Sequence, residues 1–415
     1  MATTHKPFRE LIPPGTNFEF VGRTRLWATL STLLIAGCIA MLFVNKATRG
    51  SMLNWTIDFS GGTEIIFKFE GDKTIGSGQV RDALKDSGFV GVEVSDYAWK
   101  EKNVADEEVT ANGLRIRTPD FGAVDPEQRN AHAEAFTAKF NDRNILKVNW
   151  SGDTMFVRSK ASFKQGEVAE FFTSVGLEMK PWGDASADFA TAEEGTGEYN
   201  AYFAIWGIDR QYQQALSERL EGTTVSVVQV YGVGPKAGEQ LRNDGLKSMF
   251  YVMVLIMLYL VFRFDVRYAP GASLALLHDG ILVIGVFAVT WTDFSLTTVA
   301  AILTVIGYSV NDTVVIFDRI RENVGRLKDK KFARVINISL NEVLSRTLLT
   351  SLTTFTVTLM MNIFGTGLVR NFAFAMNIGV VVGTYSSVFV AAPVALFIHN
   401  RYFAAPVKEA AKAIT

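Results

Sequence analysis

Long apolar runs without charge interrupt an otherwise ordinary polar sequence. The first, Leu26 to Val44, has 19 uncharged residues, which at about 1.5 Å per residue are enough to cross a hydrocarbon core of about 30 Å. A cleaved signal peptide is the alternative, but the run is too long for one and no small-residue cleavage site follows it. We therefore expect an uncleaved membrane helix.

Five further apolar runs follow a long polar stretch and predict five more membrane helices. The shortest has 15 uncharged residues between Lys247 and Arg263, so it crosses a bilayer only if these two basic side chains reach the interfaces. The predicted fold class is an α-helical membrane protein with six transmembrane helices and a large α/β domain between the first two. The five runs are Ser248 to Phe262, Tyr268 to Thr292, Phe294 to Phe317, Thr347 to Val369 and Asn371 to Ile398.

Basic residues in the short loops predict the orientation. Seven Lys or Arg lie between Arg319 and Arg334, whereas the short loops on the opposite side hold only Arg370. By the positive-inside rule both termini are cytoplasmic and the large domain is exported. Four more basic residues precede the first helix: Lys6, Arg9, Arg23 and Arg25. The predicted segments are a cytoplasmic N-terminus 1–25, a first membrane helix 26–44, an extracytoplasmic domain 45–247, membrane helices 248–398 with a cytoplasmic loop 318–346, and a cytoplasmic tail 399–415.

The exported stretch has the alternating and helix-periodic patterns of an α/β domain. Gly61-Gly62 opens a β-rich run at Thr63 to Phe69, and the order β-α-β-β-α ends in a helix that starts near Asp125-Pro126-Glu127. A similar order begins again at Met155, and Gly78-Gln79-Val80 recurs 88 residues later as Gly-Glu-Val. We interpret this as two tandem ferredoxin-like units, with a chance match inside one α/β domain as the alternative. The other predicted elements are helices at Gln79 to Ser87, Glu167 to Val175 and Arg210 to Leu220, and strands at Val92 to Trp99, Leu114 to Thr118, Met155 to Arg158, Ala201 to Trp206 and Thr224 to Tyr231.

Composition excludes one class of function and leaves the compartment open. The 415 residues include 41 basic and 42 acidic side chains, a formal net charge of −1, so no basic surface for nucleic acid is indicated. The hydrophobic fraction of 48% is ordinary and becomes informative only through its clustering. The single cysteine, Cys38, cannot form an internal disulfide, so an oxidising compartment is neither supported nor excluded.

Asp312 is a charged residue inside the fourth membrane run. Such residues cost about 2.5 to 3.5 kcal/mol or more and are functional candidates by default. The aspartate lies six residues inside the cytoplasmic end of its helix, about 9 Å deep, too far for its short side chain to reach that boundary. Tyr308 and Ser309 lie one turn away on the same face, and Asn311 and Thr313 flank the aspartate. A proton-titrating site is the functional interpretation, and a helix-packing hydrogen bond is the alternative.

His278-Asp279 and Arg346 complete the predicted proton path. The first pair lies near the middle of the third run, where histidine exchanges protons near neutral pH and an adjacent carboxyl group gives the pair the properties of a relay. Arg346 stands at the start of the fifth run, and its proton is permanent. If it contacts Asp312, proton binding to that carboxylate breaks the pair and creates a two-state element. Packing of the first pair, and a snorkelling arginine, are the alternatives.

Enzyme motifs are weak in this chain. Two intramembrane aspartates suit an aspartyl protease, but their settings, His-Asp-Gly and Asn-Asp-Thr, differ from the Tyr-Asp and Gly-x-Gly-Asp of such proteases, and HExxH and GxSxG are absent. Gly232-Val233-Gly234-Pro235 lacks the spacing of an ATP-binding loop. An ion gradient, worth about 2.3 kcal/mol per charge at 100 mV, is then the expected energy source. We expect a coupled transporter, with no catalytic residue, cofactor or metal.

Three further motifs predict local structure. Gly379 to Gly383 is a GxxxG pattern that favours close helix packing. Asp58 to Thr63 predicts a tight turn into the exported sheet, with an ion entrance at Asp58 as the alternative. Arg334 to Arg346 has the pattern of a short amphipathic helix on the cytoplasmic membrane surface.

The chain resembles the SecF side of the SecD/SecF family, in the resistance-nodulation-division superfamily. The matching residues cover the junction after the first helix and nearly everything from Val230 to Tyr402. The exported domain departs from the family pattern, because it is roughly twice the usual single ferredoxin-like unit, with about Asp120 to Asn200 as the extra segment. The motifs are Ile57 to Thr63 (IDFSGGT), Val233 to Pro235 (VGP), Phe262 to Phe264 (FRF), His278-Asp279, Gly307 to Asn323 (GYSVNDTVVIFDRIREN) and Ser345 to Thr350 (SRTLLT).

This resemblance implies a role in protein export. It implies a subunit that pairs with SecD in the bacterial inner membrane, beside the SecYEG channel, and uses the proton motive force to promote movement of precursor polypeptides. The family's proton-path aspartate falls on Asp312 and its partnering arginine on Arg346. H⁺ is the expected coupling ion and Na⁺ stays open, as do the dependent precursors, the stoichiometry and the role of the enlarged domain. A half-transporter that exports small molecules or lipids is the alternative function.

Overall fold

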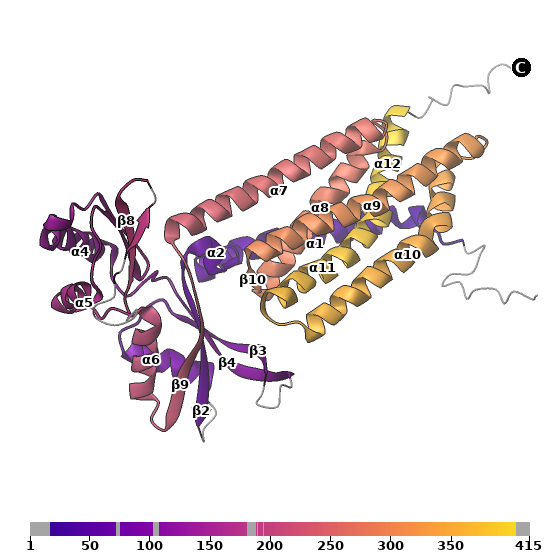
Figure 1. Ribbon diagram of the computed structural model, residues 1–415. Coiled ribbons are helices and arrows are strands. Elements are labelled where there is room, and N and C mark those ends of the chain that lie inside the picture. The colour runs from indigo at the N-terminus through magenta and orange to yellow at the C-terminus, as the bar shows by residue number, and fades with distance from the viewer. Residues whose placement is uncertain are drawn as a thin grey trace, which may run out of the picture. The chain divides into compact units, whose positions relative to one another are not determined.

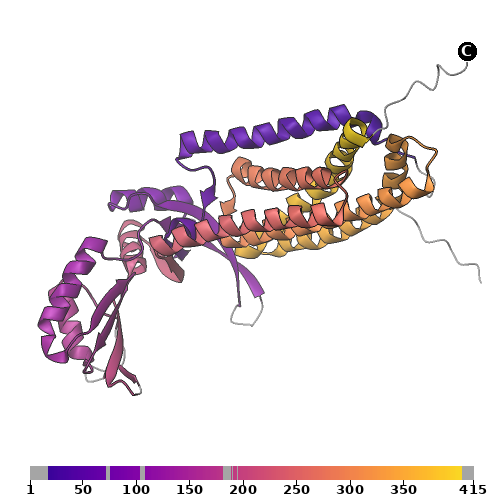
Figure 2. The same cartoon turned by 90° about the horizontal axis from the view of Figure 1, so that it is seen from above.

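The computed structural model describes residues 17–71, 75–102, 108–180, 188, 190–193 and 195–403. The chain divides into two compact units, an exported unit of residues Thr56–Arg242 and a helical unit formed by the parts before and after it. Both units are shown in Figure 1 and, turned by 90°, in Figure 2. The two N-terminal basic residues Lys6 and Arg9, and most of the predicted C-terminal tail, lie outside the described residues.

The helical unit confirms the six predicted membrane helices. The described residues contain six helices long and apolar enough to cross a membrane. Large apolar side chains such as Leu33, Phe250 and Phe262 are exposed along the first two, as expected of helices that face lipid. The six helices are α1 (Thr24–Arg49), α7 (Pro235–Arg263), α8 (Ala269–Thr290), α9 (Leu296–Arg326), α10 (Phe332–Phe364) and α11 (Gly367–Ser386).

Several of these helices are longer than the apolar runs. α7 begins at Pro235 rather than Ser248, and its 29 residues span about 43 Å, more than the hydrocarbon core requires. The predicted cytoplasmic loop 318–346 shrinks to residues 327–331, because α9 continues to Arg326 and α10 begins at Phe332. An apolar run shows only which part of a helix lies in lipid. The helix itself can continue into water, where its polar turns form hydrogen bonds and ion pairs.

The predicted surface helix at 334–346 is instead the first part of α10. Ile336 and Leu340 are fully buried against residues of α9 and α8, in the main apolar cluster of this unit. Asn323 of α9 donates to the Ser339 hydroxyl at 2.9 Å, and Arg319 pairs with Glu342 at 2.7 Å. The amphipathic pattern is therefore satisfied by protein, and the interpretation as a helix lying on the membrane was wrong. Figure 1 shows the first turns of α10 running at an angle to the rest.

The sixth membrane helix changes its winding at its middle. α11 is followed by a π-helical segment, Ser387–Ala391, then α12 (Ala392–Ile398) and a second π-helical segment, His399–Phe403. Pro393 lies at the start of α12. Proline has no N–H to continue the α-helical bonding pattern, which gives a physical reason for the wider turn that precedes it.

Glycines let α9 and α11 approach closely, as the GxxxG pattern predicts. A Cβ atom on Gly379 would lie 2.1 Å from a methyl carbon of Val305, and one on Gly383 would lie 3.0 Å from the Cβ of Ser309. The contact between the two helices therefore depends on the missing side chains. It brings α11 against the face of α9 that carries the polar residues described below.

The first sheet of the exported unit is ferredoxin-like. Its strands are all antiparallel, in the order β3-β4-β2-β9, and the chain order β-α-β-β-α-β is that of a split βαβ motif. Apolar residues including Ile65, Phe67 and Leu84 form its core. The elements are β2 (Gly62–Gly71), α3 (Ser77–Asp86), β3 (Glu93–Lys102), β4 (Glu108–Thr118), α6 (Ile208–Arg219) and β9 (Thr223–Val233).

A second sheet is inserted between β4 and α6. Its order is β5-β6-β8-β7, built from two successive α-β-β units whose second strands pair antiparallel at the centre. Six phenylalanines, among them Phe136 and Phe203, fill the core between the sheet and its two helices. The elements are α4 (Pro126–Lys139), β5 (Lys147–Ser151), β6 (Thr154–Ser159), α5 (Gln165–Ser174), β7 (Thr191–Glu193) and β8 (Glu198–Ala204). We call this the nested subdomain.

The tandem arrangement expected from the sequence was therefore wrong, although both sheets exist. The helix that starts at Pro126 belongs to the second sheet, whereas α6 and β9 return to close the first. Local patterns specify helices and strands but do not record which sheet a strand joins. The 88-residue recurrence aligns α3, which packs on the first sheet, with α5, which packs on the second. The second sheet nevertheless does not have the ferredoxin-like strand order.

A two-glycine turn leads into β2. The one-turn helix α2 (Ile57–Ser60) ends at Gly61 and Gly62, whose φ angles are 72° and 110°. A Cβ atom on Gly62 would lie 2.2 Å from the carbonyl oxygen of Thr118. The predicted tight turn is confirmed, and its glycines are required both by conformation and by space.

We predict that Gly62→Ala lowers the free energy of unfolding of the full-length protein by at least about 2 kcal/mol. Gly88→Ala is the matched control, because Gly88 also has a positive φ, 90°, but nothing lies within 4 Å of an added Cβ; its cost should be about 1 kcal/mol. Guanidinium unfolding followed by tryptophan fluorescence measures both. Equal losses of unfolding free energy in the two variants would mean that the close approach of Gly62 to Thr118 does not contribute to the effect.

Asp153 of the nested subdomain forms hydrogen bonds with the chain segments that enter and leave this subdomain. Its carboxylate accepts a hydrogen bond from the backbone N–H of Ala123 at 2.6 Å and one from Ile208 at 3.3 Å. Burial raises the pKa of Asp153 above its usual 3.8, and the two N–H groups oppose this shift. Asp209 raises this pKa further, whereas Lys180 lowers it.

This shift predicts a pH dependence that Asp153→Asn removes. The folded chain holds the carboxyl proton more tightly than the unfolded chain, so the stability from this group is fully present below the unfolded pKa and is lost as pH rises through the raised folded pKa. The wild type should therefore lose free energy of unfolding relative to Asp153→Asn as pH rises above about 3.9. Guanidinium unfolding at a series of pH values measures the difference. A difference that stays constant with pH would contradict the assignment.

Candidate functional site

Two carboxyl groups are buried in the middle of the helical unit. Asp279 of α8 is 0% exposed and Asp312 of α9 is 3% exposed. Each has hydroxyl groups from neighbouring helices as partners rather than a lysine or arginine. A buried polar group without a partner is costly, so these hydrogen bonds are what compensates the burial of both carboxyl groups.

Asp279 joins three helices. Ser309 of α9 and Ser386 of α11 both donate to its Oδ2 atom, Ser386 at 2.8 Å. Its Oδ1 atom lies 2.9 Å from Nδ1 of His278. The predicted pairing of His278 with Asp279 is therefore present, and Ser309 of the predicted polar face contacts it.

Asp312 contacts the fifth and sixth helices through one hydroxyl group. Ser351 of α10 donates to its Oδ2 atom at 3.4 Å and lies 2.6 Å from the hydroxyl of Thr384 on α11. Tyr308 donates to Ser351 at 3.4 Å. Tyr308 therefore reaches the aspartate through Ser351 rather than directly.

The two aspartates belong to one layer of polar side chains, which we call the polar belt. Ser309 contacts Asp279 and lies three residues from Asp312, about 4.5 Å along α9. Thr313 extends the layer to Ser387 at 2.8 Å. The π-helical segment that begins at Ser387 follows directly on Ser386, and both serine side chains are buried in the belt. The polar belt consists of His278, Asp279, Tyr308, Ser309, Asp312, Thr313, Ser351, Thr384, Ser386 and Ser387.

Two predicted residues lie outside this layer. Asn311 is exposed, although Asp312 and Thr313, which follow it on α9, are both buried. Arg346 is also exposed, and among the described residues no ion pair joins it to Asp312. It lies five residues, about 7.5 Å, before Ser351, the residue of α10 that Asp312 does contact. The expected Asp312–Arg346 pair is not formed in this structure.

His278 connects the polar belt to a groove on the outer side of the bundle. A cavity of about 840 Å³ lies between α1, α8 and the segment from Phe389 to Asn400. His278 is part of its lining, along with apolar side chains such as Ile281. The Nε2 atom of His278 is buried and has no hydrogen-bond partner among the described residues. Beside it, Tyr385 and Ser31 share a hydrogen bond of 2.8 Å. His278 is therefore the residue of the polar belt that lines this cavity.

Four residues of the polar belt were missed in the sequence. Hydroxyl-bearing residues are common in membrane helices, where they often bond to their own backbone, so they give no signal by themselves. A run of four hydroxyl groups, Thr384 to Ser387, was the available hint, because it occurs in an otherwise apolar helix. The missed residues are Ser351, Thr384, Ser386 and Ser387.

The chemistry available in the belt is proton exchange. Carboxyl, imidazole and hydroxyl groups each bind and release a proton or pass one along a hydrogen bond. Within the described part of the chain, no group of three or more His, Cys, Asp or Glu side chains is placed to hold a metal ion. These groups lie at the interfaces of α8, α9, α10 and α11.

Comparison with known proteins identifies relatives. The family described as "Protein export membrane protein SecD/SecF, C-terminal" matches residues 213–401. The protein translocase subunit SecF of Koribacter versatilis is 33% identical over 383 residues, 91% of this chain and 91% of that protein. SecF of Rhodothermus marinus is 42% identical over 200 residues, 47% of this chain and 65% of that one. SecF of Rickettsia rickettsii is 46% identical over 171 residues, 41% of this chain and 56% of that one.

Solved structures agree with these relatives. The crystal structure of SecDF, a translocon-associated membrane protein from Thermus thermophilus, matches 93% of this chain with a TM-score of 0.59 and 25% identity. SecDF in a super-membrane-facing form matches 94% with a TM-score of 0.52. The chain spans 39% and 40% of those two longer chains. Because the Koribacter relative is matched over nearly its whole length, we conclude that the present chain belongs to the SecF subunits of the SecD/SecF protein-export family.

Proposed function

We propose that this Sec protein-export subunit couples the proton motive force to the movement of precursor polypeptides. In this proposal the chain lies in the bacterial inner membrane with both termini in the cytoplasm and the exported unit outside. It acts with SecD beside the SecYEG channel. The chain's membership in the SecF subunits supports this proposal. The main structural observation behind it is that Asp312 is buried beside hydroxyl groups.

Asp312 has two alternative kinds of partner on α10. A protonated carboxyl group is satisfied by Ser351, which it contacts at 3.4 Å. An ionised carboxylate is attracted to a permanent positive charge. Arg346 lies on α10, five residues before Ser351, and has no ion-pair partner among the described residues. Moving from one partner to the other requires α9 and α10 to shift relative to each other. Proton binding and release would thus be converted into helix motion.

His278 and Asp279 form the second part of the proposed path. The free Nε2 atom of His278 receives the proton, Asp279 exchanges it with the imidazole, and Ser309 links Asp279 to α9 one turn from Asp312. H⁺ is the proposed coupling ion, because in the described part of the chain Asp312 has one hydroxyl partner, Ser351, rather than the ring of oxygen ligands that a metal cation prefers. Export driven by a pH gradient, compared with a Na⁺ gradient, tests this choice.

The relatives do not favour the half-transporter, and the exported unit offers a direct test of the export role. A photo-crosslinking residue in place of Tyr97, on the helix-free face of the first sheet, should form an adduct with a precursor protein only while export is in progress. SecD and SecYEG should purify with the tagged full-length chain. Absence of both results, together with gradient-driven efflux of a small molecule, would favour the half-transporter.

A further inference from the structure

The edge of the nested subdomain carries an open groove. β5 is an outer strand of its sheet, with β6 as its partner strand in the described structure. The pairing runs from Lys147 to Ser151 without a register shift. The strand has no proline, and Lys147 is its one charged residue, so it lacks most of the devices that block an edge strand.

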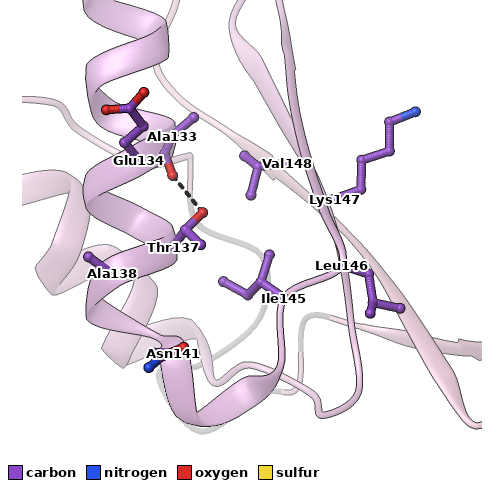
Figure 3. Close-up of a pocket in the computed structure, with 9 residues that line it drawn as sticks. All are labelled: Ala133, Glu134, Thr137, Ala138, Asn141, Ile145, Leu146, Lys147 and Val148. Atoms are coloured by element: carbon purple, nitrogen blue, oxygen red, sulfur yellow. Dashed lines mark hydrogen bonds between the residues drawn. The ribbon is translucent and has the colours of Figure 1, made fainter.

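The groove lies between this edge and α4 and has a volume of about 680 Å³. Figure 3 shows Ile145 and Val148 pointing from the strand side toward the helix, and Thr137 folded back so that its hydroxyl bonds the carbonyl of Ala133. The helix side also includes Ala138, Glu134 and Asn141. The small side chains Ala133, Thr137 and Ala138 on this side leave room for side chains from outside.

The core of the nested subdomain continues to this edge without cover. Ile145, Val148 and Trp150 pack against the buried phenylalanine cluster but are themselves only half buried. An additional strand beside β5 would cover them and would satisfy the outward backbone groups of the edge at the same time. The rim is electrically balanced, with Lys147 on the strand and Glu134 on the helix, so it favours neither sign of charge in an occupant.

We propose that this groove binds an extended segment of unfolded polypeptide by adding it as a strand to β5. Main-chain hydrogen bonds supply the affinity, and alternate side chains enter the groove over Ala133 and Ala138. Recognition through the main chain tolerates many sequences. Five residues of β5 extend over about 17 Å, so the bound segment is about five residues long.

The occupant is an exported polypeptide, an identity that rests on the proposed function. A second copy of this chain fits less well, because pairing of two β5 strands at about 4.8 Å would bring two copies of α4 to the same groove. Packed helices need about 8 to 10 Å between their axes. A single extended segment has no such helix. β7, the other edge of this sheet, has three residues, Thr191–Glu193, and supports a much shorter pairing.

The test uses the full-length protein in lipid nanodiscs without an ion gradient. The probe is fluorescent α-lactalbumin kept unfolded by reduction and carboxymethylation, and native α-lactalbumin is the control probe. Ala138→Trp fills the groove from an exposed position, whereas Ala135→Trp adds the same side chain to an exposed site of α4 outside the groove lining. We expect Ala138→Trp to weaken binding of the unfolded probe by at least about tenfold, with Ala135→Trp unchanged. Native α-lactalbumin should not bind.

Hydrogen exchange locates the bound segment. The amides of Lys147–Ser151 should exchange more slowly in the presence of the unfolded probe, in the wild type and in Ala135→Trp but not in Ala138→Trp. Equal binding by both tryptophan variants, or no protection in β5, would overturn the proposal. Protection that appears with protein concentration in the absence of probe would instead assign the edge to a second copy. Because no gradient is used, these outcomes are independent of whether proton coupling through Asp312 is correct.

Discussion

Asp312→Asn should reduce gradient-driven export of a reporter protein to the level seen without this chain. The amide keeps the size and shape of the carboxyl group and still accepts the hydrogen bond from Ser351. It cannot bind or release a proton, and it carries no charge to attract Arg346. Both partners of the proposed two-state element stay in place, but nothing changes the preference between them. The loss should therefore be complete rather than partial.

The experiment compares Asp312→Asn with a neighbouring substitution in cells or vesicles. Asn311→Ala is the matched control, because this exposed side chain lies next to Asp312 but outside the polar belt. Membrane insertion and binding of SecD are checked in each variant, so that a folding defect is not mistaken for a coupling defect. Unchanged export in Asp312→Asn would make Asp312 a packing residue and would move the proton path to His278 and Asp279.

Asp279→Ala should destabilise the helical unit by about 3 kcal/mol or more. Three groups then lose an acceptor in a fully buried site: Ser309, Ser386 and the imidazole of His278. A buried donor left without its acceptor costs about 1 to 3 kcal/mol, and this substitution removes the acceptor of three groups at once. The effect should exceed that of Ser386→Ala, which removes a single donor and costs about 1 kcal/mol.

Thermal unfolding of the detergent-solubilised protein measures these differences. Asp279→Asn separates structure from proton transfer, because the amide retains an acceptor and the serine hydroxyls can turn to meet its N–H group. It should keep most of the stability and still lower gradient-driven export. A loss of stability from Asp279→Ala no larger than that from Ser386→Ala would show that Asp279 does not hold the three helices together.

The sequence identified the charged members of the site but not how they are joined. A carboxylate in an apolar run stands out, so Asp279 and Asp312 were found directly, with His278 through its neighbour. The serines and threonines that bind them do not stand out, because the same residues serve ordinary helices. Asn311 lies outside the belt whereas Thr313 lies in it, although both are next to Asp312 in the sequence. The pairing with Arg346 required the register of α9 against α10, which the residues of one helix do not contain.

For the fold, too, the sequence predicted the individual elements but not all of the contacts between them. Apolar runs specified six membrane helices, and the two-glycine motif specified a turn that the positive φ angles of Gly61 and Gly62 confirm. The ferredoxin-like order was expected, but the partner strands were not, because β2 pairs with β9 across the entire nested subdomain. Secondary structure follows from neighbouring residues, whereas sheet order depends on contacts between residues that are far apart along the chain.

The nesting also sets an order of folding for the exported unit. Gly62 pairs with Val233, 171 residues later, whereas every strand of the nested subdomain lies between Lys147 and Ala204. Contacts that close short loops form faster than those that close long ones. The nested subdomain should therefore fold while β2 still lacks β9 beside it. The ferredoxin-like sheet begins first along the chain but is the last to be completed.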